Sequence, residues 1–129
     1  MKAVQFRIAR PTNQLDAIIR FYTEGVGLEI IGEFKDHQGY DGVMFGLPGK
    51  EHHLEFTSYA DTTEIPAPTK EHLLVFYFND FTHYTEANER LKQMGCFPVE
   101  PENPYWNGKS ETYEDPDKWR IVFFNGIFK

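Results

Sequence analysis

One predicted strand, "HHLEF" at residues 52–56, carries side chains that could bind a metal ion or move a proton. His53 and Glu55 are two residues apart, so both side chains point to the same face of an extended strand. Imidazole and carboxylate are common ligands of transition metals, and a carboxylate can also act as a general base. His53 and Glu55 therefore mark a candidate site, and a buried Glu55 would need a polar partner in either case.

A second candidate is the aromatic pair Tyr105 and Trp106, which lies in a segment that also contains Pro98, Pro101 and Pro104. Prolines at this spacing favour an extended loop. Two aromatic side chains in such a loop could form a lid that stacks on a flat or apolar ligand. Alternatively, Trp106 could pack against a sheet and anchor the loop, or the pair could lie in a dimer interface.

The strands and helices that must position these residues follow the pattern of an internal duplication, in which one structural unit occurs twice. "GLPGKEHHLEF" at residues 46–56 has a counterpart in "DPDKWRIVFF" at residues 115–124, each being a proline-containing turn followed by a strand. In this alignment Glu55 falls on Val122. Each half has only about 60 residues, too few to bury a good core alone, so we expect the halves to pack together with a site at their junction.

The first half, module one at residues 1–60, is predicted to run strand, helix and three strands. Its strands are expected at residues 4–9, 28–34, 41–47 and 52–59. The helix is expected to begin after Asn13, whose side chain can cap it, and to end at Gly25 and Gly27. Residues 61–71 are polar and rich in proline and threonine, which is typical of a linker.

The second half, module two at residues 72–129, repeats this order. Its strands are expected at residues 72–78, 96–99, 110–114 and 119–124. Asp80 can cap the helix, which should end at Gly95. The whole chain is thus predicted to form a single domain at 1–129.

Composition excludes some classes of function. A net charge of −7 provides no basic stripe for nucleic acid or for an anionic membrane surface. The single cysteine, Cys96, cannot form an internal disulfide, which suits a reducing compartment. No apolar stretch is long enough for a membrane span or a signal peptide, so we expect a cytoplasmic protein.

The repeated strand–helix–three-strand order resembles the vicinal-oxygen-chelate (VOC) superfamily, which includes glyoxalase I, extradiol dioxygenases, fosfomycin-resistance enzymes and bleomycin-resistance proteins. Residues 10–31, "RPTNQLDAIIRFYTEGVGLEII", resemble the family's strand-to-helix segment, and "HLEFT" and "EDPDKWRIVFF" look like its closing strands. The resemblance implies an α+β fold in which two βαβββ modules form an eight-stranded, open, cup-shaped mixed sheet. A fold does not fix function in so diverse a group.

In metal-dependent members of the superfamily, the first and last strands of each module supply His or Glu ligands to a divalent cation. The resemblance places Glu55 and His72 at two of these four positions. Phe6 and Val122 occupy the other two, and neither can bind a metal. His53 could supply a third ligand, because it shares a strand face with Glu55.

The other interpretation is a pocket without a metal, in which Glu55 accepts hydrogen bonds from Arg7 or His72. The expected ligand pocket then contains Arg7, Glu55, His72, Tyr105 and Trp106, and no cofactor is expected. Catalytic residues cannot be assigned from the sequence.

The resemblance implies a glyoxalase/bleomycin-resistance-like protein that binds a small organic molecule in the cup, without a catalytic metal. The alternative is a divalent-metal-dependent lyase, isomerase or thiol transferase of the glyoxalase I or fosfomycin-resistance type, with Glu55 and His72 as ligands and water or His53 completing the shell. A metal-free enzyme with Glu55 as general base is a third possibility. An extradiol dioxygenase is disfavoured, because Val122 replaces the carboxylate on the last strand.

We also expect a homodimer. The open sheet edges of such a fold need covering, and two-fold pairing is the commonest oligomeric arrangement. The sequence leaves open whether a cup forms within one chain or by exchange of modules between two.

Overall fold

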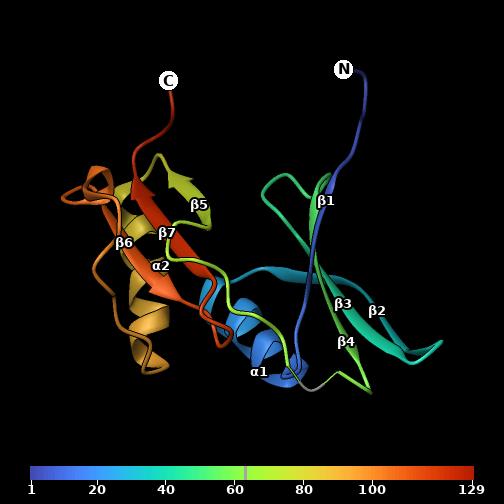
Figure 1. Ribbon diagram of the computed structural model, residues 1–129. Helices are drawn as coiled ribbons and strands as arrows, with labels where there is room; N and C mark the ends of the chain where they lie inside the picture. Colours follow the sequence, from blue (N-terminus) through green and yellow to red (C-terminus); the bar gives the residue numbers. More distant parts are fainter. Residues whose placement is uncertain (63) are drawn as a thin grey trace. The chain divides into compact units, whose positions relative to one another are not determined.

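The computed structural model describes residues 1–62 and 64–129, so Thr63 in the expected linker lies outside the described residues. Two compact units are present (Figure 1). The first comprises Met1–Thr23 and Gly27–Pro66, and the second comprises Glu24–Val26 and Ala67–Lys129. Each unit is described by itself below.

The first unit contains a four-stranded sheet with the strand order β1-β4-β3-β2. Its strands are β1 (Arg7–Pro11), β2 (Glu29–His37), β3 (Tyr40–Gly46) and β4 (His53–Tyr59). β1 runs parallel to β4, and the other neighbours are antiparallel. The order strand, helix and three strands is therefore the one predicted for module one.

The helix of this unit, α1 (Leu15–Arg20), continues into a π-helical segment, η1 (Phe21–Val26), and packs on β4. Tyr22 lies 5.0 Å from Phe56 between ring centroids and 5.6 Å from Phe45. All three side chains are buried. Since alternate residues of a strand point to opposite faces, His53 and Glu55 lie on the sheet face away from this core.

The predicted start of this helix was wrong by one residue. Gln14, not Asn13, is the N-cap, and its side chain makes no capping hydrogen bond. Instead, the hydroxyl of Thr12 accepts a hydrogen bond from the Gln14 N–H at 3.1 Å. The predicted stop is present, because Gly27 ends η1 with a φ of 88°, a backbone conformation that glycine adopts readily.

The second unit contains a three-stranded sheet with the order β5-β7-β6. Its elements are β5 (Leu73–Phe78), α2 (Phe81–Gln93), the short 3-10 helix η2 (Pro104–Trp106), β6 (Ser110–Glu114) and β7 (Arg120–Asn125). β5 is parallel to β7, and β6 is antiparallel to it. α2 begins at the predicted cap, since the Asp80 carboxylate accepts a hydrogen bond from the His83 N–H at 3.1 Å.

The strand predicted at residues 96–99 is reduced to one bridge, between Val99 and Thr112. Pro98 has no N–H to donate to a ladder, and Pro101 removes the donor two residues after Val99, which would have extended the bridge. The loop that follows is consequently free to leave the sheet and reach η2.

Residues Glu24–Val26 group with the second unit through α2. The guanidinium of Arg90 donates hydrogen bonds to the carbonyls of Gly25 at 3.4 Å and Val26 at 3.2 Å. A Cβ on Gly25 would lie 2.7 Å from the Leu91 side chain, so this helix approach needs a glycine.

The core of the second unit lies between α2 and the sheet. Ile121, Phe123 and Leu91 are at most 1% exposed. The Tyr113 hydroxyl donates a hydrogen bond to Oδ1 of Asn88 on α2 at 2.6 Å, inside this core. Burial, with the nearby negative charge of Glu111, raises the pKa of Tyr113.

The parallel strand pair of each sheet has the same register relative to the internal sequence alignment. In the first unit Arg7 pairs with His53 and Ala9 with Glu55. In the second unit Leu73 pairs with Arg120, and Val75 pairs with Val122. Glu55 and Val122 therefore occupy equivalent places in the two units, as the internal alignment predicted.

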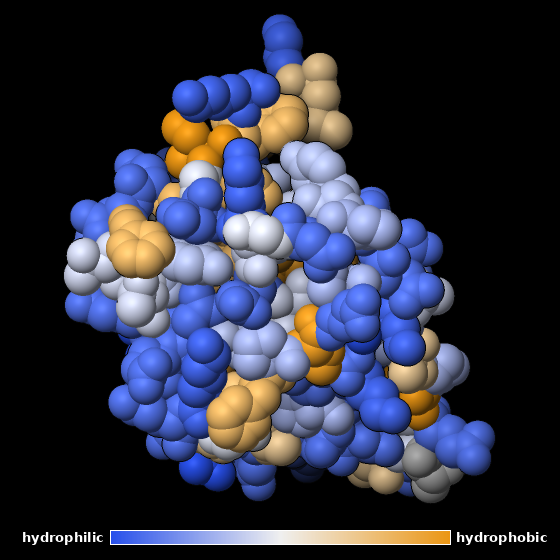
Figure 2. All heavy atoms as spheres, turned by 90° about the vertical axis from the view of Figure 1, so that its left-hand side faces the viewer, coloured by the Kyte–Doolittle hydropathy of each residue, from blue (hydrophilic) through white to orange (hydrophobic). Residues whose placement is uncertain are grey.

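No helix among residues 1–62 and 64–129 is long and apolar enough to cross a membrane. The face shown in Figure 2 is mostly hydrophilic, with apolar side chains in small separate groups. Scattered apolar side chains of this kind are usual on protein surfaces and do not by themselves indicate a binding interface.

Candidate functional site

Arg7 joins the two residues that the sequence marked as possible metal ligands. β1 lies beside β4, and the pairing of Arg7 with His53 places the guanidinium over the face that His53 shares with Glu55. Arg7 Nη1 donates a hydrogen bond to Glu55 Oε2 at 3.0 Å, and Arg7 Nε donates one to His53 Nε2 at 2.8 Å. The predicted hydrogen bond from Arg7 to Glu55 is thus present.

These contacts assign the roles of the two ring nitrogens of His53. Because Nε2 accepts a hydrogen bond from the Arg7 guanidinium, Nδ1 is the nitrogen that can donate one. That Nδ1 atom is buried and has no hydrogen-bond partner within residues 1–62 and 64–129. The cluster therefore holds one buried donor that a bound acceptor could satisfy.

The same contacts bear on metal binding. A divalent cation bound by His53 and Glu55 would have to displace the positive charge of Arg7 from both ligands. The Glu55 side chain is only 12% exposed, so it is shielded from water and the ion pair is stronger than an exposed one. No three His, Cys, Asp or Glu side chains in the described part of either unit gather as metal ligands would.

His72 belongs to the second unit, where it is exposed and directly precedes β5. Its Nδ1 accepts a hydrogen bond from the Thr69 N–H at 3.1 Å and lies 2.8 Å from the Thr69 hydroxyl. Within this unit, His72 does not line the pocket described next.

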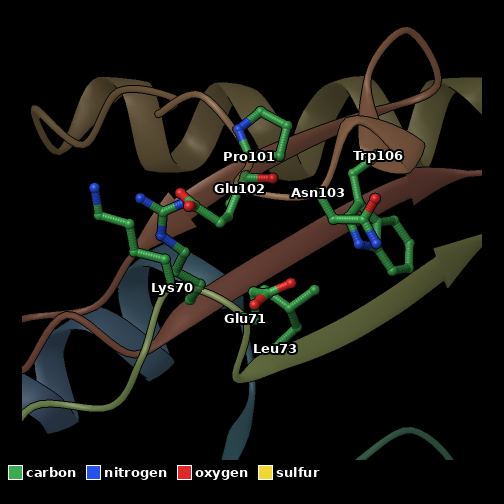
Figure 3. A pocket seen from close by; sticks show the side chains of 9 residues that line it. Lys70, Glu71, Leu73, Pro101, Glu102, Asn103 and Trp106 are labelled. Atoms are coloured by element: carbon green, nitrogen blue, oxygen red, sulfur yellow. The ribbon is translucent and has the colours of Figure 1, made fainter.

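A pocket of the second unit lies on the sheet face away from α2 and encloses about 310 Å³ of empty space, part of it open to solvent. In Figure 3, Lys70 lies at one end and Trp106 at the other, with Glu71 and Leu73 below and the loop of Pro101 above. Its lining residues are Lys70, Glu71, Leu73, Pro101, Glu102, Asn103, Trp106, Thr112 and Arg120.

Arg120 is the buried charge of this pocket, at 4% exposure. Its Nε donates a hydrogen bond to Glu114 Oε2 at 3.2 Å, and its Nη1 donates one to the Glu100 carbonyl at 2.9 Å. Its Nη2 donates to no group in the described part of the chain. The guanidinium is therefore held rigidly on two sides and keeps free donors.

Two other polar side chains of the pocket also keep unused donors. Thr112 is 2% exposed, and its hydroxyl makes no hydrogen bond with residues 1–62 or 64–129. Asn103 Oδ1 accepts the Tyr105 N–H at 3.0 Å, which leaves the amide –NH₂ of Asn103 unused in the described protein. The lining therefore offers a donor from the buried Thr112 and another from the exposed Asn103.

The aromatic pair separates into two roles. Trp106 lines the pocket and meets Phe124 of β7 edge-on, at 6.0 Å between ring centroids. Its carbonyl accepts a hydrogen bond from the Ser110 hydroxyl. Tyr105 contacts Trp106 at 4.9 Å, but it is 70% exposed and does not line the pocket. Trp106 thus contacts the sheet, as expected of a loop anchor, and also lines the cavity.

Sequence reasoning missed the polar residues that accompany Trp106, above all Arg120. A signal was available. Arg120 follows Trp119 within the otherwise apolar strand "WRIVFF", two residues before Val122 and on the same strand face. A charged residue inside an apolar strand must find a partner, which marks a polar site.

Family models match both halves of the chain. Residues 6–57 match the YycE-like N-terminal domain, and residues 71–125 match the YycE-like C-terminal domain. The uncharacterized protein YycE of Bacillus subtilis (strain 168) is 56% identical over 124 residues, covering 96% of this chain and 89% of the relative. The chain belongs to the YycE-like family.

Solved structures agree with this assignment. A crystal structure of a YycE protein of unknown function from Bacillus subtilis is 54% identical, with a TM-score of 0.93 over 99% of this chain and 93% of that one. Glyoxalase I of Leishmania major has a TM-score of 0.71 at 19% identity, covering 92% and 84% of the two chains. TnmS3, an antibiotic binding protein from Streptomyces sp. CB03234, has a TM-score of 0.67 at 20% identity and 98% coverage of both chains.

At such low identity the last two comparisons show the fold alone. They confirm the predicted α+β fold of βαβββ modules and the resemblance to the VOC superfamily. The chain therefore has the fold of the VOC superfamily, and the similar Bacillus subtilis structure is itself named as a candidate glyoxalase/fosfomycin resistance protein.

Proposed function

We propose that this YycE-like protein binds a small organic molecule without the help of a catalytic metal. The observation that carries the proposal is the position of Arg7. Its guanidinium donates hydrogen bonds to His53 at 2.8 Å and to Glu55 at 3.0 Å, and so occupies both side chains that a metal would need on β4. A fixed positive charge in this place favours an anionic or hydrogen-bonding ligand over a cation.

The pocket of the second unit supports the same proposal. It offers an aromatic side chain, Trp106, beside several polar donors around a buried Arg120. A cavity with an apolar wall and a few fixed polar groups is the usual form of a small-molecule site. TnmS3, which shares the fold, is an antibiotic binding protein, so the fold accommodates binding of organic ligands.

The alternative proposal is a metal-dependent lyase, isomerase or thiol transferase, with Glu55, His72 and His53 as candidate ligands. Glyoxalase I shares the fold, and Glu55 and His53 lie on one strand face. Such a site would require Arg7 to swing away, which its 45% exposed side chain would permit sterically. The cost would be the loss of two charge-assisted hydrogen bonds.

Metal analysis separates the two proposals. Protein purified without added metal is analysed for transition metals, and its melting temperature is measured with and without a chelator. We expect no stoichiometric metal and no change in melting temperature. One bound equivalent, together with a lower melting temperature after chelation, would favour the metal-dependent enzyme.

Two further expectations accompany the proposal. A homodimer is proposed because the sheets have edge strands, β1 and β2 in the first and β5 and β6 in the second, and a second copy commonly covers such edges. A cytoplasmic location is proposed because the single cysteine suits a reducing compartment.

A further inference from the structure

We infer that the pocket of the second unit selects a small aromatic carboxylic acid, with its carboxylate at Arg120 and its ring against Trp106. The inference rests on the proposed small-molecule function and names the class of ligand. Its basis is the buried guanidinium of Arg120 beside the buried hydroxyl of Thr112, on a lining that also carries the carboxylates of Glu71 and Glu102.

Arg120 provides the main recognition group. Glu114 and the Glu100 carbonyl already bind Nε and Nη1, so the plane of the guanidinium is fixed before any ligand arrives. The remaining donors on Nη1 and Nη2 can bind the two oxygens of a carboxylate. Little conformational entropy is lost when a preorganised group binds, which favours affinity for a matching anion.

Three neighbouring side chains offer further donors or positive charge to an oxyanion bound at Arg120. The hydroxyl of Thr112 and the amide of Asn103 both keep unused donors, and Lys70 adds a positive charge at one end. A ligand oxygen that accepts from these groups would satisfy donors that the described protein leaves unpaired.

The carboxylates near the pocket limit how much negative charge a ligand can carry. Lys70 and Arg120 are balanced by Glu71 and Glu102 on the lining, and Arg120 is also paired with Glu114. A dianion such as a phosphonate would meet three carboxylates with only two cations nearby. A carboxylate carries one charge, so it fits the guanidinium with less repulsion from the rim.

The apolar part of the pocket defines the rest of the ligand. Trp106 lies at the end opposite Lys70, and the Leu73 side chain lies between them (Figure 3). An aromatic ring can stack on or meet the indole edge-on, and both geometries are favourable. The cavity volume proper is about 70 Å³, well below that of usual ligand sites, so the pocket should take nothing larger than a single-ring acid.

The experiment uses the full chain, labelled with ¹⁵N, and benzoate as the probe. The chain has two tryptophans, Trp106 and Trp119, so its spectrum holds two indole N–H signals, and Trp106→Phe assigns them. We expect benzoate to shift the Trp106 signal in a saturable manner and to leave the Trp119 signal unchanged. Benzyl alcohol, benzylamine and acetate are titrated in parallel. Each should bind at least about tenfold more weakly than benzoate, because the first two lack the carboxylate and acetate lacks the ring.

Variants test the two ends of the pocket. Trp106→Leu should weaken benzoate binding about two- to tenfold, and Lys70→Gln about two- to fivefold. Lys50→Gln is the matched control, because Lys50 is an exposed lysine of the first unit paired with Glu29. It should bind benzoate like the wild type. Arg120→Lys should weaken benzoate binding at least about tenfold. If the Arg120→Lys variant does not fold, the Trp106→Leu and Lys70→Gln variants still test the pocket.

The outcomes separate the inference from the function on which it rests. Equal binding of benzyl alcohol or benzylamine at Trp106 would overturn the acid selectivity while leaving small-molecule binding intact. Equal losses in the Lys50→Gln and Lys70→Gln variants would likewise overturn the assignment to this pocket. Binding of an organic probe only after a divalent metal is added would instead overturn the proposed metal-independent function.

Discussion

Replacing Trp106 with alanine tests whether this residue belongs chiefly to the pocket or to the core. The structure indicates an intermediate position, since Trp106 is partly exposed, meets two aromatic rings edge-on and lines a cavity. Each aromatic pair contributes about 0.5–1.5 kcal/mol beyond its buried area. The two pairs together therefore suggest a loss of about 1–3 kcal/mol in the free energy of unfolding.

Trp119 provides the matched control, because it is the other tryptophan of the same unit and is only 8% exposed. Truncating a buried tryptophan to alanine usually costs about 3–5 kcal/mol. We therefore expect Trp119→Ala to destabilise the protein clearly more than Trp106→Ala. Measuring the midpoint and slope of urea unfolding for both variants gives the two free energies on one scale.

The relative stability of the two tryptophan variants decides whether Trp106 can belong to the ligand site. If Trp106→Ala costs as much as Trp119→Ala, Trp106 is a core anchor, and its place in the ligand site is lost. If Trp106→Ala costs less than Trp119→Ala, as expected, the remaining question is ligand affinity, which the benzoate titration measures independently.

The remaining predictions concern Tyr113, Arg7 and the oligomeric state. Tyr113→Phe should lower the free energy of unfolding by about 1–3 kcal/mol, because Asn88 Oδ1 loses its buried donor. The pKa of Tyr113 is raised above its usual value of about 10, so the free energy of unfolding of the wild type should fall as the pH rises above about 10. The Tyr113→Phe variant should show a shallower fall over the same pH range. Equal slopes of unfolding free energy against pH in the two proteins would contradict this. The Arg7→Ala variant should bind Zn²⁺ measurably in calorimetry, whereas the wild type should not, because the substitution releases His53 and Glu55 from their hydrogen bonds with Arg7. Equal Zn²⁺ affinity in the two proteins would count against Arg7 as the group that competes with the metal. Light scattering at micromolar concentration should give the mass of a dimer, and a monomer mass would refute the proposed pairing.

Much of the fold could be predicted from local signals. Turn residues, alternating apolar positions and the repeated order of elements set the two units, and the alignment of Glu55 with Val122 matches the observed register. The predictions of element boundaries were wrong where competing local interactions decide where a helix or strand begins. Asn13 has a good capping side chain, but the helix begins one residue later, with Gln14 at the N-cap. The strand predicted at residues 96–99 lost its donors to proline.

The candidate site was less predictable, because it depends on side chains brought together by strand pairing. The sequence identified Arg7 as a partner of Glu55, but the contact of Arg7 with His53 follows only from the β1–β4 register. Arg120 was overlooked, because its partner carbonyl at Glu100 lies in an irregular loop that no periodic pattern predicts. Loop geometry and paired charges are set by tertiary packing, which local sequence rules do not describe.

The central claim is that the protein binds an organic ligand without a metal, and one titration tests it most directly. The dissociation constant of benzoate is measured on the same protein sample in chelator and after an excess of Zn²⁺ or Mn²⁺ has been added. The account predicts equal affinity under both conditions. Binding that disappears in chelator and returns with the metal would contradict it.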